Sequence, residues 1–161
     1  MALAMIEEAE KRGDLKPGMT VVEYTGGSTG SSLAFVCAVK GYPFKVVSSN
    51  AFSREKLQTM KAFGADLVIV HSDSGVTTPD LIPRMMEKAK QLADSDDCYF
   101  TNQIYNRDII VDNSNIGREI LRQFQGSPDA CFDYATECHI ASQIAEYRLN
   151  KFGELDSDRR K

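Results

Sequence analysis

The residues best suited to chemistry lie in a glycine-rich stretch at residues 25–30, with the sequence TGGSTG. It joins residues 20–24, a short β-branched run that predicts a strand, to residues 31–40, an apolar segment that predicts a helix. A glycine-rich turn that leads into a helix presents several backbone N–H groups in one direction, and the helix start adds partial positive charge. The stretch therefore predicts a phosphate or carboxylate site, with a turn capped by Ser or Thr as the structural alternative.

Two more specific interpretations of this loop compete. It is not a P-loop, because the Lys-Ser/Thr ending is absent. Residues 26–30 do fit G-x-S-x-G, which between a strand and a helix is the form of a nucleophile elbow. Ser28 would then be the nucleophile of a small serine hydrolase, and it would need a histidine base. His71 ends a strand too early for the usual order, His139 lies near the C-terminus, and each is more often a surface or packing residue.

Strands and helices alternate along the chain with short connections. Helices are predicted over residues 1–12, 31–40, 54–63, 80–93, 116–124 and 140–152, and strands over 20–24, 45–48, 66–70, 98–101 and 130–134. The first helix is expected to bury the face of Leu3, Ile6 and Ala9. The pattern predicts an α/β fold, an open, mostly parallel sheet flanked by helices in three α/β/α layers.

Composition excludes several functional classes. The 161 residues include 23 acidic and 19 basic side chains, and a net charge of -4 gives nucleic-acid binding no electrostatic support. No apolar run approaches the ~18 residues of a membrane span, and acids stand where a signal peptide is basic, so a cytoplasmic protein is expected. No metal site is predicted, and buried thiols are expected rather than redox or metal-binding ones at Cys37, Cys98, Cys131 and Cys138.

Several motifs occur in an order that resembles a known family. Residues 2–42, followed by FSREKLQTMKAFGADLVIV, TPDLI, YFTNQIYNRD and NIGREI, resemble the cysteine synthase / cystathionine β-synthase group of pyridoxal-phosphate-dependent enzymes, which have the tryptophan-synthase-β-like fold. The resemblance covers about residues 1–124. It implies that residues 1–134 form part of the family domain, with the small substrate-loop subdomain at about residues 20–110, and that residues 135–161 are a divergent C-terminal helix and tail.

The resemblance also implies roles for individual residues. In the family the glycine-rich loop binds the α-carboxylate of the amino-acid substrate, through positions that match Thr25, Gly26, Ser28 and Thr29. Many relatives have Asn at the position of Ser28, where it reaches the 3′-oxygen of the cofactor, and the shorter Ser28 weakens or replaces that contact. Gln103 matches a glutamine that also contacts the carboxylate, and Asn106 matches a nearby loop asparagine. Hydrogen bonding within the loop is the alternative for both.

The implied reaction forms cysteine from O-acetylserine and sulfide on pyridoxal 5′-phosphate, which serves as the electron sink. Two family features are missing from the sequence. The lysine that carries the internal imine directly precedes the first helix in relatives, and no lysine here stands in that context; Lys16 and Lys56 are expected to be solvated surface charges. The glycine-rich loop for the cofactor phosphate, which should follow Tyr134, is also absent.

The chain is therefore expected to be a truncated member of the family that has no catalytic residue of its own and no turnover alone. The alternative to a cysteine-synthase-type enzyme is a non-catalytic fragment that binds a small amino acid, or that pairs as a homodimer or with a full-length relative. The hydrolase that uses Ser28 is the second alternative. The sequence does not select the substrate, because O-acetylserine, serine and cysteine present the same carboxylate.

Overall fold

The computed structural model describes residues 1–110 and residue 119. The chain divides into two compact units, Met1–Asn106 and Arg107–Lys161, and every element below belongs to the first. Several predictions lie outside the described residues: the helix over 140–152, the strand over 130–134, the boundary at residue 134 and the side chains of Cys131, Cys138 and His139. The helix predicted over 116–124 is described only at Glu119, which is helical.

The first unit is built on a four-stranded parallel sheet. Strand β1 (Thr20–Tyr24) pairs with β2 (Phe44–Ser48) and with β4 (Cys98–Phe100), and β2 pairs with β3 (Asp66–Ile69), so the order is β3-β2-β1-β4. The chain winds from β1 towards β3 and then crosses to the far side of β1. The winding therefore reverses between β1 and β4, which is where open α/β sheets bind ligands beyond the carboxyl ends of their strands.

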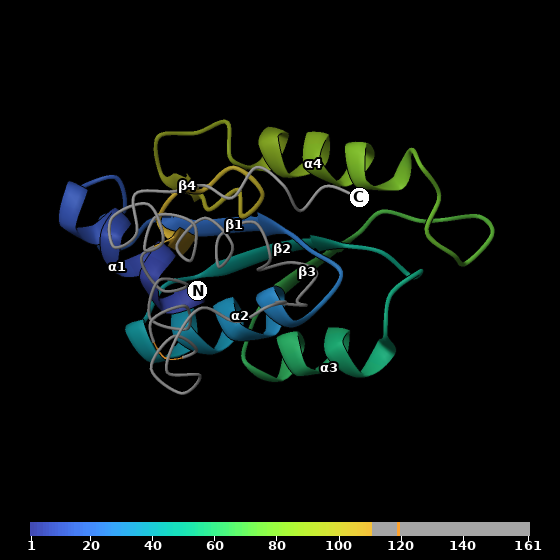
Figure 1. Ribbon diagram of the computed structural model, residues 1–161, viewed down its shortest axis with the longest axis horizontal. Coiled ribbons are helices and arrows are strands. Elements are labelled where there is room, and N and C mark those ends of the chain that lie inside the picture. Colours follow the sequence, from blue (N-terminus) through green and yellow to red (C-terminus); the bar gives the residue numbers. More distant parts are fainter. Residues whose placement is uncertain (111–118, 120–161) are drawn as a thin grey trace, which may run out of the picture. The chain divides into compact units, whose positions relative to one another are not determined.

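Helices cover both faces of this sheet (Figure 1). Helices α1 (Ala2–Arg12), α2 (Ser28–Lys40) and α3 (Arg54–Ala62) lie on one side, and α4 (Leu81–Leu92) lies on the other. The predicted α/β class, a parallel sheet flanked by helices in three layers, is confirmed. Among the described residues, no helix is both long enough and apolar enough to cross a membrane.

Local sequence explains most of the helix boundaries. Gly13 and Gly41 have φ values of 78° and 80° and end α1 and α2 in the left-handed conformation that glycine adopts without strain. The Ser53 hydroxyl caps α3 as predicted, since it accepts a hydrogen bond from the Lys56 N–H. One boundary is corrected: α2 begins at Ser28, three residues earlier than predicted, because Gly27 serves as its N-cap.

The core has one layer on each face of the sheet. On the α4 face a cluster joins the strands to the predicted stripe of that helix, and its buried members are Val22, Tyr24, Val47, Leu81, Met85 and Ala89. On the other face α1 buries Met5, Ile6 and Ala9, together with Ala2. The predicted burial of Leu3 is wrong, since its side chain is 50% exposed. The bulky side chains of Met5 and Ile6 lie at the middle of the buried face. Because successive residues of a helix are rotated by about 100°, Leu3 lies outside this face.

The corrected face of α1 predicts different effects for two alanine substitutions. Ile6→Ala is expected to lower the free energy of unfolding by about 2–5 kcal/mol, because the side chain is fully buried and leaves a cavity. Leu3→Ala is the matched control, expected to change it by less than about 0.5 kcal/mol. Urea denaturation of both variants measures the difference. Equal losses of unfolding free energy would mean that the buried face of α1 is assigned incorrectly.

Candidate functional site

The glycine-rich loop leaves the carboxyl end of β1 and ends in the first turn of α2. Thr25 is buried; its N–H donates to the Val47 carbonyl (2.9 Å), and its Oγ1 accepts from the Gly27 N–H (3.3 Å). The Gly27 carbonyl then accepts from the Gly30 N–H (3.1 Å), which closes the turn. No side chain in the described part of the chain caps this helix start. The backbone N–H groups at the helix start are therefore not capped by a side chain, which is the arrangement that a predicted anion site requires.

Close packing explains two of the three glycines in the loop. A β-carbon on Gly26 would stand 2.4 Å from the ring of Phe52. A β-carbon on Gly30 would stand 2.5 Å from Thr25 Cγ2 and 2.6 Å from Met60 Cε. Distances this short do not occur between real carbon atoms, so any larger residue would push the loop from its place. Gly26 and Gly30 therefore allow the loop backbone to pack tightly against α3 and the segment before it.

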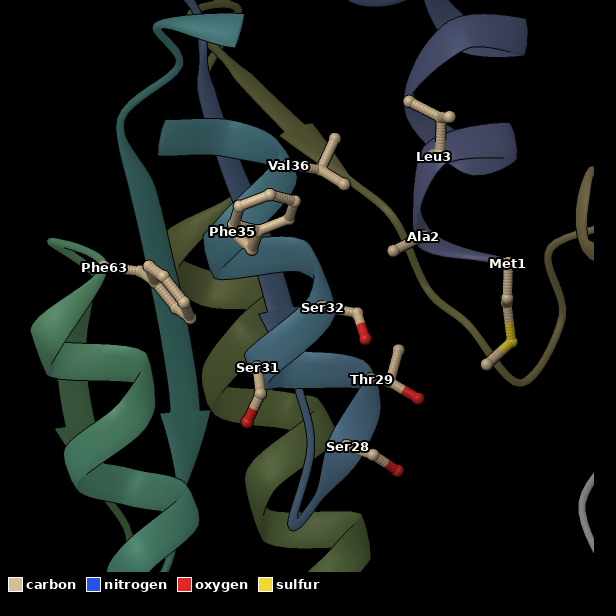
Figure 2. Close-up of a pocket in the computed structure, with 10 residues that line it drawn as sticks. All are labelled: Met1, Ala2, Leu3, Ser28, Thr29, Ser31, Ser32, Phe35, Val36 and Phe63. Atoms are coloured by element: carbon tan, nitrogen blue, oxygen red, sulfur yellow. The ribbon is translucent and has the colours of Figure 1, made fainter. Parts of the chain in front are cut away.

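An apolar groove of about 520 Å³ opens beside the start of α2 (Figure 2). The hydroxyls of Ser28, Thr29 and Ser32 point towards the side of α2 on which Met1 lies, and the hydroxyl of Ser31 points away from it. Leu3, Phe35 and Phe63 add apolar side chains, all at least 40% exposed. The groove has the size of a small-molecule site, with hydroxyls at one end and apolar walls at the other.

The segment after β4 brings Gln103 to the end of β1. Its backbone N–H donates to Glu23 Oε2 (2.8 Å), and its side-chain Nε2 donates to the Tyr24 carbonyl (3.3 Å), directly before the glycine-rich loop. The Nδ2 of Asn106 donates to the Thr101 carbonyl (2.7 Å), a bond within its own loop. The structure thus brings Gln103 to the residue before the glycine-rich loop through bonds to β1, while Asn106 makes the hydrogen bond within its loop that was its alternative role.

Glu23 is a buried acid that sequence analysis left without a role. Its Oε2 accepts from the Thr101 hydroxyl (2.7 Å) and the Gln103 N–H, and its Oε1 accepts from the Tyr24 N–H (2.7 Å). Burial raises the pKa of this carboxyl group to about 7, although the three hydrogen bonds act to lower it. The available signal was a single acid inside a strand otherwise composed of β-branched and aromatic residues.

Lys56 is the second residue whose position the sequence did not predict. Its side chain is exposed, as expected. Its Nζ nevertheless lies 3.4 Å from the point where a β-carbon on Gly27 would stand. The ammonium group therefore adds positive charge beside the uncapped start of α2, where an anion would bind.

The geometry gives the hydrolase interpretation no support. Ser28 is the first residue of α2, and across the described chain the only non-glycine residue with a positive φ is Asn102 (46°), so Ser28 does not occupy a strained elbow. His71 follows β3 and lines a different groove, shared with Asn50 and Arg54. His139 lies outside the described residues.

Comparison with known sequences matches residues 1–137 to the family described as "Pyridoxal-phosphate dependent enzyme". A cysteine synthase of Staphylococcus aureus is 39% identical over 127 residues, which are 78% of this chain and 39% of that protein. Cysteine synthase B of Escherichia coli is 45% identical over 75 residues, which are 47% of this chain and 25% of that protein. The chain thus spans 39% and 25% of the lengths of these two relatives.

Solved structures share the same arrangement. A hydrogen sulfide-producing enzyme from Fusobacterium nucleatum aligns with a TM-score of 0.76 and 28% identity, over 92% of this chain and 49% of that one. A cysteine synthase from Entamoeba histolytica aligns with a TM-score of 0.73 and 29% identity, over 91% of this chain and 43% of that one. The parallel sheet with helices on both faces is therefore similar to the fold of cysteine-synthase-like enzymes.

The raised pKa of Glu23 predicts a particular dependence of stability on pH. A carboxyl group whose pKa is raised by folding contributes most below its unfolded pKa of about 4.5, and that contribution is lost as pH rises through about 7. The free energy of unfolding should therefore fall by about 3 kcal/mol over this range relative to Glu23→Gln. Urea denaturation between pH 4.5 and pH 8 measures the difference.

Glu10 provides a control of opposite sign. Its pKa is lowered, first by the hydrogen bond from Lys40, so its contribution is lost as pH falls. The advantage of the wild type over Glu10→Gln should therefore be nearly constant above pH 4.5 and should shrink only as pH falls below it. Parallel curves for the wild type and Glu23→Gln would show that Glu23 does not titrate in this range.

Proposed function

Because the chain belongs to the pyridoxal-phosphate-dependent enzyme family, we propose that its glycine-rich loop binds the α-carboxylate of an amino acid, as the substrate end of a cysteine-synthase-type site. The observation that carries this proposal is the hydrogen bond from Gln103 Nε2 to the Tyr24 carbonyl, which brings Gln103 to the residue directly before the loop, where the sheet reverses its winding. The helix start, free hydroxyls and a nearby ammonium all favour a bound anion there.

The loop residues divide this work. Ser28 and Thr29 offer hydroxyl and backbone donors at the groove, so they make the direct contacts to the carboxylate. Gly26 allows the loop backbone to pack against Phe52, because the Phe52 ring leaves no space for a side chain at position 26. Thr25 acts through the loop, because its buried hydroxyl already holds the Gly27 N–H. Gln103, in the segment after β4, lies at the end of β1 next to the start of the loop.

The family relies on pyridoxal phosphate, which when bound supplies an electron sink for amino-acid chemistry. The resemblance to the family assigns the cofactor contact to Ser28, whose hydroxyl lies at the groove. No lysine among residues 1–110 lines the groove beside Ser28 and Thr29. The described residues therefore fit the substrate end of the family's site and do not fit the end that forms an imine with the cofactor.

We therefore propose that this chain alone binds O-acetylserine without converting it. Calorimetry should show binding of O-acetylserine, and the chain supplied with pyridoxal phosphate and sulfide should form no cysteine. The methyl ester of O-acetylserine is the matched control ligand, because it lacks the carboxylate and should not bind. Cysteine formation would overturn the absence of turnover, and equal binding of the ester would overturn the carboxylate site.

Pairing with a full-length relative is the second candidate role, favoured by the half-exposed Phe35 and Phe63 beside the groove. Apolar side chains that remain accessible next to a binding site are typical of interaction surfaces. Co-expression with a tagged full-length cysteine synthase tests this role. Recovery of a stoichiometric complex supports it, and recovery of the two chains separately rejects it.

The position of Lys56 predicts a modest electrostatic contribution to binding. Lys56→Gln is expected to weaken O-acetylserine binding about two- to fivefold and to reduce its dependence on salt, since an exposed charge acts weakly through solvent. Lys61→Gln is the matched control from the same helix and should leave affinity unchanged. Equal effects of the two substitutions, measured by calorimetry at low and high salt, would mean that Lys56 acts only through net charge.

A further inference from the structure

We propose that Glu23 is a positioning residue, a buried carboxylate that fixes Gln103 and the glycine-rich loop relative to each other. The inference rests on the proposed function, since it concerns the two segments that would hold the amino acid. Glu23 has no exposed surface and lines neither the groove beside α2 nor the groove at His71, so it acts through its neighbours rather than on the ligand.

On the β4 side, Glu23 holds the backbone on which Gln103 stands. Its Oε2 accepts both the Gln103 N–H (2.8 Å) and the Thr101 hydroxyl (2.7 Å). Thr101 also returns to β1, because its N–H and its hydroxyl both donate to the Val22 carbonyl. The chain thus leaves β4 with two residues tied to β1.

On the β1 side, the other carboxylate oxygen holds the residue that precedes the glycine-rich loop. Glu23 Oε1 accepts the Tyr24 N–H (2.7 Å), and the Tyr24 carbonyl accepts Gln103 Nε2 (3.3 Å). Thr25 follows directly, with its own N–H on Val47. A single carboxylate therefore connects the first residue before the loop with the glutamine that closes the site.

The arrangement requires a carboxylate rather than an amide. The N–H groups of Tyr24 and Gln103 are fixed in the backbone, and each points at a different oxygen of Glu23. An amide at this position would turn its NH₂ group towards one of these two donors in either orientation. Protonation is less disruptive, because the Thr101 hydroxyl can rotate to accept the new proton, but it weakens the acceptor offered to Gln103.

No cation stabilises the charged form of Glu23 in the described chain. Burial raises the pKa of this carboxyl group, and its three hydrogen-bond donors lower it. Burial and then Glu23 raise the pKa of Tyr24, with a smaller effect of Tyr105. Helix α2 carries the buried Cys37, and burial raises the pKa of this thiol to about 12. On α4, the buried residues facing the sheet are apolar.

Amide NMR of the whole chain between pH 5.5 and pH 8.5 tests the inference. In the wild type, the amides of Tyr24 and Gln103 should titrate with a midpoint near 7, and those of residues 25–29 should follow the same midpoint. Titration with L-serine, whose carboxylate stays ionised throughout, should show an affinity that falls several-fold as pH drops from 8 to 6. A contact that is merely structural would move neither the loop amides nor the affinity with this midpoint.

Two variants and a control complete the experiment. Glu23→Gln should bind L-serine about tenfold more weakly at pH 8 and lose the midpoint, whereas Glu10→Gln, a carboxylate of the α1 surface, should behave as the wild type. Thr101→Val keeps the carboxylate and removes one donor, so it should raise the midpoint and weaken binding less. If Glu23→Gln does not fold, the wild-type titration and Thr101→Val decide the matter.

Three outcomes overturn the inference: wild-type affinity in a folded Glu23→Gln variant, loop amides that ignore the midpoint of Gln103, or an unchanged midpoint in Thr101→Val. Failure of the proposed function gives a different result. If the wild-type chain does not bind L-serine, the proposed carboxylate site is rejected. The shared titration of the Gln103 amide and the amides of residues 25–29 still shows whether Glu23 couples the two segments.

Discussion

The buried carboxylate of Glu23 is the interaction on which the arrangement of the candidate site depends. Strand β4 has three residues and pairs with β1 through three register positions, the last of which is Val22 opposite Phe100. Beyond Phe100 one backbone bond remains, from the Thr101 N–H to the Val22 carbonyl, and the hydrogen bonds of Glu23 with Thr101 and Gln103 continue the connection between the two segments. At the reversal point of the sheet, where a ligand would bind, side-chain hydrogen bonds thus extend the strand pairing.

The buried carboxylate lowers the stability of the fold but fixes the positions of Gln103 and the glycine-rich loop. An apolar residue at position 23 would avoid the desolvation that raises the pKa of Glu23, and apolar replacements of buried charges are often neutral or stabilising. Other unfavourable features gather at the same edge of the sheet. Asn102 adopts a positive φ of 46°, and its Oδ1 is buried without a partner in the described chain, as is the Ser48 hydroxyl at the end of β2. Unfavourable terms concentrated at one edge are typical of a functional site.

The sequence predicted the features that depend on neighbouring residues. The β-branched run of β1, the glycines that end α1 and α2 and the cap at Ser53 are local, and each was found. The start of α2 was missed because Gly27 serves as its N-cap, and the exposure of Leu3 because Met5 and Ile6 together define the buried face of α1. The roles of Glu23 and Lys56 could not be predicted, since Glu23 meets Thr101 across 78 residues and Lys56 meets Gly27 only when α3 packs on α2.

Binding and turnover are separable in this architecture. The proposed anion site consists of backbone donors, a helix start, two hydroxyls and the Glu23 connection, and all of these lie within Met1–Asn106. None of them needs the cofactor for its geometry, because each is positioned by hydrogen bonds within the same unit. Cofactor chemistry requires a lysine at the reacting atoms, which the groove residues do not supply. A chain with this unit can therefore keep the recognition of an amino-acid carboxylate whether or not it carries the groups that transform the amino acid.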